Sequence, residues 1–251
     1  MRRFLVSAVC FLLGSHLLAQ TNSVPNLAAN FQWGQKLLTY ENGVATQAWF
    51  FAPVVAGRSY CAETGNVESF TLSEKQPNTA LVVFGHDTTT AFATNDDVTN
   101  EPRARFLSRV CWIPALTEDN FVELVVPSTT YASYIQIRFL ETTLYCPWFF
   151  IAGDYNAFSL IRNTSNTALS GVVVTWRGLN GTVAGTTTVT VPANGTFIVN
   201  ARDFVSPALF SNGSIEIAHA GAPDQLKGST TTLSGTTGLG FDALFEQRKT
   251  W

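Results

Sequence analysis

Residues 134–140 read Tyr-Ile-Gln-Ile-Arg-Phe-Leu, a stretch in which apolar and polar side chains alternate. Successive side chains of a β-strand point to opposite faces, so the two isoleucines and the phenylalanine share one face, and the glutamine and arginine share the other. Such a segment buries one face and leaves the other in water. The pattern predicts a strand in a sheet that has one solvent-exposed side.

Strand-like segments recur along the whole chain. Short apolar runs at 48–52, 81–84 and 121–126 have the length of sandwich strands and are too short for typical helices. Residues 157–163, 171–176, 186–191, 197–199 and 214–219 continue the series in the second half. Only 13% of residues are charged, and Thr, Gly and Asn are frequent, which suits short strands joined by tight turns.

Asn-Gly dipeptides separate several of these segments. They begin at Asn42, Asn180, Asn194 and Asn212, and Asn-Gly is the strongest two-residue hairpin signal. The second half therefore reads as a meander of hairpins, with a short helical turn or loop at 202–210. We predict an all-β protein made of two consecutive antiparallel β-sandwiches, jelly-roll or immunoglobulin-like.

A domain junction is predicted within residues 141–158. Pro147 fixes its own φ and favours an extended Cys146, so we expect the chain to turn there. Trp148, Phe149, Phe150 and Tyr155 supply aromatic area that we expect to seat the halves against each other. The predicted domains are residues 20–145 and 146–251.

The first 19 residues have the order of a secretory signal peptide. Arg2 and Arg3 precede a short apolar run, and Ala19 precedes the polar Gln20. No stretch has the roughly 20 apolar residues of a membrane span. We predict a secreted protein, periplasmic or extracellular, without a membrane span.

Charge excludes one class of partner. The sequence has 15 Lys+Arg and 18 Asp+Glu, and two of the bases lie in the leader, so the mature net charge is 13 − 18 = −5. Nucleic-acid binding needs a basic footprint, which this balance lacks.

Three cysteines remain in the mature chain, Cys61, Cys111 and Cys146. In an oxidising compartment two of them are expected to pair. We favour Cys61 with Cys111, since both lie in strand-like segments of the first half, although spacing alone leaves Cys146 open as a partner.

The first half resembles a known family. The order Phe-Phe-Ala-Pro-Val-Val-Ala-Gly-Arg-Ser-Tyr at 50–60, the apolar strand at 81–84, Thr-Asn-Asp-Asp at 94–97, Ser-Arg-Val-Cys-Trp-Ile-Pro-Ala at 108–115 and the strand at 134–139 is similar to the bacterial pre-peptidase C-terminal domain. The resemblance covers roughly 48–140 and implies a secreted β-sandwich that accompanies extracellular enzymes. Some members are similar to calcium-dependent collagen-binding modules. No peptidase domain is evident here, and the second half resembles uncharacterised secreted bacterial β-sandwich domains.

Calcium is the one candidate cofactor. Asp87, Asp96 and Asp97 lie in oxygen-rich loops of the first half, and Ca²⁺ takes six to eight oxygen ligands. The competing interpretation is that these residues make turns and caps, because the Asp-x-Asp-x-Asp-Gly spacing is missing.

The C-terminal tail is unusually aromatic. A Gly/Thr/Ser-rich stretch leads into Phe241, Phe245 and Trp251. We expect a final strand that docks onto the second sandwich. The alternative is a binding surface made of Phe245, Arg248 and Trp251.

Catalytic motifs are missing. The mature chain has two histidines, His86 and His219, and lacks both Gly-x-Ser-x-Gly and His-Glu-x-x-His. We therefore predict a non-catalytic binding or accessory module that recognises carbohydrate, a matrix protein or a partner subunit. A structural or assembly component of the envelope or of a filament is the alternative, and a carboxylate-dependent hydrolase comes third.

Overall fold

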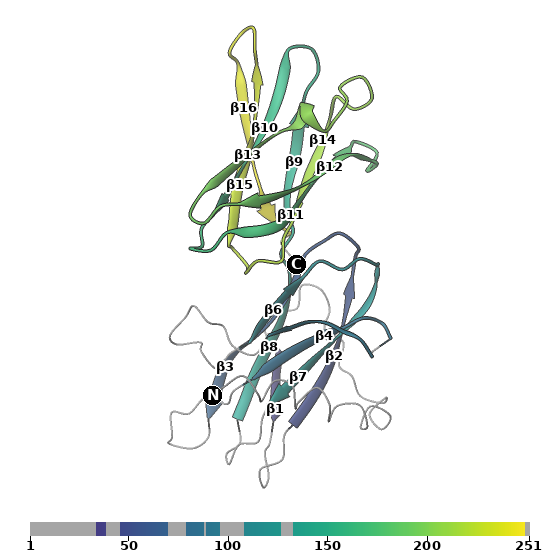
Figure 1. Cartoon of the computed structure of the whole chain (residues 1–251), viewed down its shortest axis with the longest axis vertical. Coiled ribbons are helices and arrows are strands. Elements are labelled where there is room, and N and C mark those ends of the chain that lie inside the picture. Colours follow the sequence, from purple (N-terminus) through teal and green to yellow (C-terminus); the bar gives the residue numbers. More distant parts are fainter. Residues whose placement is uncertain are drawn as a thin grey trace.

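The computed structural model describes residues 34–38, 46–69, 79–87, 89–95, 108–126 and 133–248. Nearly all of these residues lie in strands or tight turns, every strand pair is antiparallel, and the described part contains no α-helix (Figure 1). The all-β prediction is confirmed. Within the same residues, no helix has the length and apolar character needed to cross a bilayer.

The first half forms two four-stranded sheets. Its strands are β1 (Gly34–Leu38), β2 (Thr46–Val54), β3 (Tyr60–Ser69), β4 (Ala80–Phe84), β5 (Ala91–Asn95), β6 (Arg109–Trp112), β7 (Glu118–Val126) and β8 (Ser133–Glu141). One sheet has the order β2-β7-β4-β5 and the other β1-β8-β3-β6.

A single core lies between these two sheets. Val122 and Leu124 of β7 meet Tyr60 of β3 and Phe139 of β8, and Tyr60 stacks on Phe139 with ring centroids 5.4 Å apart. Ile137 and Phe139 are buried while Arg138 between them is half-exposed, as the alternation at 134–140 predicts. Period-two patterning therefore decides which side of β8 faces the core.

The second half is a sandwich of a five-stranded and a four-stranded sheet. Its strands are β9 (Leu144–Phe150), β10 (Tyr155–Asn163), β11 (Leu169–Gly178), β12 (Val183–Val191), β13 (Thr196–Asn200), β14 (Asn212–Ala218), β15 (Leu226–Ser234), β16 (Gly240–Leu244) and β17 (Glu246–Gln247). The orders are β12-β11-β14-β9-β17 and β13-β10-β15-β16. A 3-10 turn, η2 (Ala201–Asp203), follows β13, inside the loop predicted there.

Trp176 lies at the centre of the second core. It is fully buried among Ile215 and Ile217 of β14 and Ile161 of β10, so both sheets contribute. Trp176 also stacks on Phe204, with centroids 5.5 Å apart. A side chain of this size contributes about 2 to 3 kcal/mol or more by burial alone.

The predicted meander of hairpins is wrong at two of its Asn-Gly dipeptides. Asn212-Gly213 forms no turn but lies inside β14, paired with Phe150 and Phe149 of β9. Asn180-Gly181 joins the paired strands β11 and β12, with Gly181 at φ 81°, as expected for Asn-Gly. Asn194-Gly195 also turns the chain, with Asn194 at φ 49°, but the strands it joins lie in different sheets. β13 pairs with β10 of the other sheet, so the chain crosses from one sheet of the sandwich to the other after β12. Asn42-Gly43 lies outside the described residues.

The chain passes from the first sheet pair to the second at Thr142 and Thr143, between β8 and β9. We predicted the change between Tyr145 and Cys146, and a turn at Pro147. Pro147 instead lies inside β9, where the register against β14 shifts between Gly213 and Ile215. A bulge tolerates proline because no ladder hydrogen bond is needed there.

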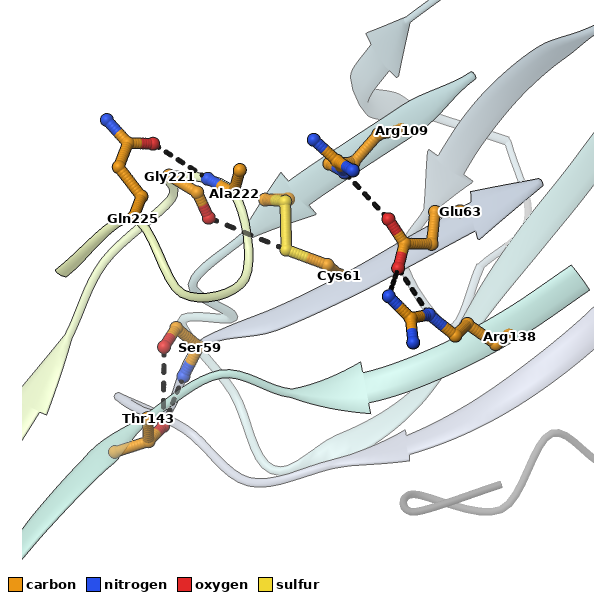
Figure 2. Close-up of a disulfide and its surroundings, with 10 residues drawn as sticks. Ser59, Cys61, Glu63, Arg109, Arg138, Thr143, Gly221, Ala222 and Gln225 are labelled. Carbon is orange, nitrogen blue, oxygen red and sulfur yellow. Dashed lines mark hydrogen bonds and ion pairs between the residues drawn. A yellow bond between two sulfur atoms is a disulfide. The ribbon is translucent and has the colours of Figure 1, made fainter. Parts of the chain in front are cut away.

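Polar contacts fasten the two halves together at this junction (Figure 2). The backbone N–H of Ser59 donates to Oγ1 of Thr143 at 2.8 Å, and the N–H of Thr142 donates to the carbonyl of Ser59 at 2.8 Å. Sγ of Cys61 lies 3.6 Å from the carbonyl oxygen of Gly221. That last contact is not a hydrogen bond, because a disulfide sulfur carries no hydrogen.

Two arginines and a tyrosine surround Glu141 at the same junction. Its buried carboxylate accepts from the hydroxyl of Tyr145, and Arg58 and Arg248 lie 3.6 and 3.9 Å away. The tail therefore returns to the junction, as Figure 1 shows for the C-terminal end. The two cations offset part of the cost of burying this carboxylate.

The predicted disulfide is confirmed. Cys61 and Cys111 lie directly opposite each other on β3 and β6 and are joined, while Cys146 is a buried free thiol. Burial raises the pKa of the Cys146 thiol, which keeps it protonated and unreactive. Close by, Glu63 is buried between Arg109 and Arg138 and pairs with both (Figure 2).

Candidate functional site

Four aromatic side chains meet where β9 and β10 of the second half are joined. They are Trp148 and Phe150 of β9, Tyr155 of β10 and Phe241 of β16. β9 belongs to one sheet, and β10 and β16 belong to the other. We call these four residues the aromatic rim.

The rim is a closed circuit of ring contacts. Trp148 stacks on Phe241, with centroids 4.6 Å apart and planes at 13°. Phe150 lies 6.0 Å from Trp148 and meets Tyr155 edge-on at 5.4 Å, and Tyr155 lies 6.3 Å from Phe241. Offset and edge-on pairs of this kind each add about 0.5 to 1.5 kcal/mol beyond area burial.

The rim is open to solvent. Trp148 is 40% and Phe241 37% exposed, and Phe150 and Tyr155 are half-buried. Scattered exposed apolar residues need no explanation, whereas touching exposed aromatics have the composition of a contact surface. This cluster is therefore the strongest candidate for a binding surface in the described chain.

Arg202 fixes the turn that carries half of the rim. Its Nη2 donates to the carbonyls of Ile151 at 2.9 Å, Gly153 at 2.6 Å and Tyr155 at 2.9 Å, and its Nε donates to Tyr155 at 3.1 Å. Gly153 has φ 61°, a left-handed conformation that glycine adopts without strain. The planar guanidinium thus holds the β9–β10 turn in one shape.

Asp154 ties this turn to the next one. Its Oδ2 accepts from the hydroxyl of Ser234 at 2.6 Å and from the backbone N–H of Thr236 at 3.0 Å, both in or beside the β15–β16 turn. These hydrogen bonds, that of Ser234 first, hold the pKa of Asp154 at about 2. The turn leading to Phe241 is therefore attached to the turn preceding Tyr155.

The expectation that Trp148, Phe149, Phe150 and Tyr155 seat the two halves against each other is wrong. Phe149 is buried in the second core, and the other three join Phe241 in the rim. The bulge in β9 explains the difference, since it places both Cys146 and Phe149 in the core despite their odd spacing. β9 also leads away from the junction, so its aromatic end lies far along the second half (Figure 1).

Sequence reasoning missed the residues that position the rim. Arg202 and Asp154 act on carbonyls and hydroxyls far away in the chain, and no local pattern marks such contacts. Phe241 was recognised only as one of the apolar residues of the tail. Among the features that position the rim, only the left-handed conformation of Gly153 is suggested by the residue type.

The predicted calcium loop is described only in part. Oδ1 of Asp87 accepts from the backbone N–H of Thr89 at 3.1 Å and of Thr90 at 3.4 Å, so this carboxylate caps its own turn. Asp96 and Asp97 lie outside the described residues. Among the residues that are described, no three His, Cys, Asp or Glu side chains come together as a metal group.

The two histidines lie in different halves. His86 is exposed beside Phe121 of the first half, with ring centroids 6.4 Å apart. His219 is fully buried after β14, and burial lowers its pKa to about 4. In the sequence His219 shares the parity of Ile215 and Ile217, which predicts that it ends a buried strand face, and its burial confirms that prediction.

Glu123 is a further buried carboxylate that the sequence did not single out. It lies on the outer face of its sheet, between Trp49 and Val82 of the neighbouring strands, and is 1% exposed. Burial raises its pKa to about 7.

The C-terminal segment docks as a strand. β16 pairs with β15 and β17 pairs with the start of β9, which confirms the docking prediction. Phe245 is buried in the second core and so is not available to a surface, whereas Arg248 is exposed and reaches Glu141. Trp251 lies outside the described residues.

Comparison with known proteins adds little. No protein-family model and no curated protein sequence match the chain. One solved structure that resembles it is the full extracellular region of zebrafish Gpr126/Adgrg6, with 12% identity and a TM-score of 0.24 over 91% of this chain. The match spans 34% of that region. At this TM-score the likeness carries no argument about fold or function.

Proposed function

We propose that the protein is a secreted, non-catalytic binding module that contacts a protein partner through the aromatic rim. The observation that carries this proposal is the partial exposure of Trp148 and Phe241 within a set of rings fixed by Arg202 and Asp154. Rings that are ordered before binding lose little conformational entropy on contact. Trp and Tyr are also enriched among the residues that dominate binding energies.

The ring geometry favours protein over carbohydrate. A sugar stacks on the open face of a ring, but Trp148 and Phe241 cover one face of each other, and Phe150 meets Tyr155 by its edge. Because one face of Trp148 and one face of Phe241 are already covered, we infer that the rim suits a side chain of a partner better than a sugar. Secretion is supported by the leader-like first 19 residues and by the Cys61–Cys111 disulfide, since such bonds persist in oxidising compartments.

Two further expectations remain proposals. An accessory role follows from the pre-peptidase C-terminal resemblance of the first half. Absence of catalysis is supported by the placement of His86 and His219 in different halves, with His219 buried.

Parallel arrays test the main proposal. The mature protein and its Trp148→Ala, Phe241→Ala and Leu209→Ala variants are applied to matrix-protein and glycan arrays. Leu209 is the matched control, because it is 77% exposed and lies outside the rim. We expect binding to protein spots that falls about tenfold or more in the two rim variants only. Binding confined to glycan spots, or unchanged by both rim variants, contradicts the proposal.

A second function, assembly through strand edges, is favoured by one observation. β12 and β13 are edge strands of the two sheets, and residues 178–201, which contain both, include no charged residue. Edge charges and prolines normally block pairing between molecules. Light scattering over a concentration series, with Ile198→Lys as the blocking variant, tests it. A strict monomer in the wild type would exclude this function.

A further inference from the structure

The outer face of the β13-β10-β15-β16 sheet is ordered in rows that the strand register defines. Side chains of Val199, Ala157 and Ile161 enter the core, so the residues between them on β13 and β10 point outward. Residues paired across strands lie side by side on this face.

One row is largely apolar. The register places Ile198, Leu160, Ser229 and Leu244 side by side across the four strands. Ile198 is 58% and Leu244 65% exposed, and Leu160 is half-buried. Phe158 lies one row further and is also half-buried, in a row that continues through Thr231 to the exposed Asp242, whose carboxylate accepts from the Thr231 hydroxyl. Apolar side chains of the Leu160 row therefore reach both edge strands, and Ser229 of β15 is its polar member.

The row on the opposite side of this apolar row from Phe158 holds two cations. Arg162 of β10 lies directly opposite Lys227 of β15, and both are exposed. Like charges placed opposite each other destabilise a sheet. Within the described residues neither has an acidic partner, since the ion pairs formed there involve other bases. Two unpaired cations beside an apolar row are thus a local cost that an anionic group of a partner relieves.

We propose that this outer face binds an acidic protein segment, with a carboxylate at Arg162 and Lys227 and apolar side chains over Leu160 and Leu244. Rows are two residues apart, or about 7 Å, so one short segment spans both features. A guanidinium takes a carboxylate in a bidentate manner, which fixes the register of the segment. The surface is distinct from the aromatic rim, so the proposal does not depend on the function assigned to the rim.

The number of cations on this face favours a protein segment over an anionic lipid surface or a sulfated polymer. A juxtamembrane basic residue contributes about 1 kcal/mol toward anionic lipid, and stable electrostatic docking there uses clusters of four to eight, far more than the two available here. Sulfated polymers, like nucleic acids, require an extended basic stripe. A single carboxylate flanked by apolar side chains matches what this face offers.

A peptide array tests the proposal on the full mature protein. Its amphipathic peptides vary the number of glutamates and of leucines independently, and a parallel set has lysine in place of each glutamate. The variants are Arg162→Glu with Lys227→Glu, and Leu244→Ser. Leu179→Ser is the control, since Leu179 is 79% exposed and lies in the turn between β11 and β12, two strands of the other sheet. All of these side chains are exposed, and circular dichroism and thermal melting check that the variants fold.

We expect binding that rises with both glutamate and leucine content and weakens with salt. Charge reversal is expected to reduce affinity for the glutamate peptides about tenfold or more, because attraction becomes repulsion. Leu244→Ser is expected to weaken binding severalfold, and Leu179→Ser to leave it unchanged. Equal binding of the glutamate and lysine sets, no binding of either, or insensitivity to charge reversal overturns the proposal. Tighter binding to phosphatidylserine vesicles or heparin than to the best glutamate peptide also overturns it.

Discussion

Trp148 lies flat against Phe241, with ring centroids 4.6 Å apart, although β9 and β16 belong to opposite sheets of the second sandwich. The ring contact therefore links the two sheets at a place where no backbone hydrogen bonds join β9 to β16. The stacked pair stabilises the fold. Because both rings are also partly exposed, they form the centre of the proposed binding surface.

The stacking of these two rings is measurable. In a double-mutant cycle with Trp148→Ala and Phe241→Ala, we expect a coupling free energy of about 0.5 to 1.5 kcal/mol in urea unfolding. A matched cycle of Trp148→Ala with Leu209→Ala is expected to be additive. Additivity in both cycles would show that the rings do not stabilise each other.

Arg202 is expected to be irreplaceable by lysine. Lysine keeps the charge but lacks the planar fork that reaches three carbonyls, so Arg202→Lys and Arg202→Ala should both destabilise the protein by about 1 to 2 kcal/mol. Hydrogen exchange should accelerate at residues 151–155 in both variants. Full rescue of stability and protection by lysine would mean that charge alone matters.

Glu123 predicts a loss of stability as the pH rises. Its pKa in the folded protein is about 7, above the ordinary value of 4.5, because it is buried. The folded state therefore binds more protons than the unfolded state between about pH 4.5 and 7, and its stability decreases across that window. Urea unfolding should show that Glu123→Gln removes about 1 to 3 kcal/mol of this dependence. An identical slope in wild type and variant would refute the assignment.

His219 predicts the opposite slope at lower pH. Burial lowers its folded pKa to about 4 from 6.5, so the unfolded state binds more protons in between. Stability is therefore complete above pH 6.5 and is lost as the pH falls toward 4, by on the order of 3 kcal/mol. Because Glu123 acts in an overlapping window, the test compares Glu123→Gln with Glu123→Gln plus His219→Gln. Equal acid sensitivity of the two proteins would contradict the prediction.

The disulfide is expected to stabilise the first half. Cys61 and Cys111 are separated by 50 positions, and closing a loop of that length contributes about 4 kcal/mol in the chain-entropy description. Dithiothreitol should lower the unfolding free energy of the wild type by about that amount. Cys146→Ser is the control, since its thiol is free, and its response to the reductant should match the wild type. A much smaller effect would indicate residual structure in the reduced, unfolded chain.

The alternating faces were predictable because side-chain parity is local. The strand at 134–140, the Asn-Gly turn at Asn180 and the burial of His219 all follow from residues near each other in sequence. Asn194 shows the limit of this reasoning. Its residue type favours a turn, but whether β13 then pairs with β12 or crosses to β10 depends on the whole sandwich.

The candidate site was less predictable for a related reason. One bulge at Pro147 changes which side chains of β9 face the core, and so moves Trp148 and Phe150 from the expected junction into the rim. Arg202 and Phe241 reach the same place from distant strands. The alternation of apolar and polar residues in a sequence does not reveal a bulge, because one inserted residue creates no repeating pattern.

The connection through Thr142 and Thr143 has a hydrodynamic consequence. Two residues reach at most about 7 Å, too little for the halves to tumble separately while Ser59 and Glu141 anchor the joint. The two halves, which lie end to end in Figure 1, therefore diffuse as one elongated particle, and its rotation is slower about the transverse axes than about the long one.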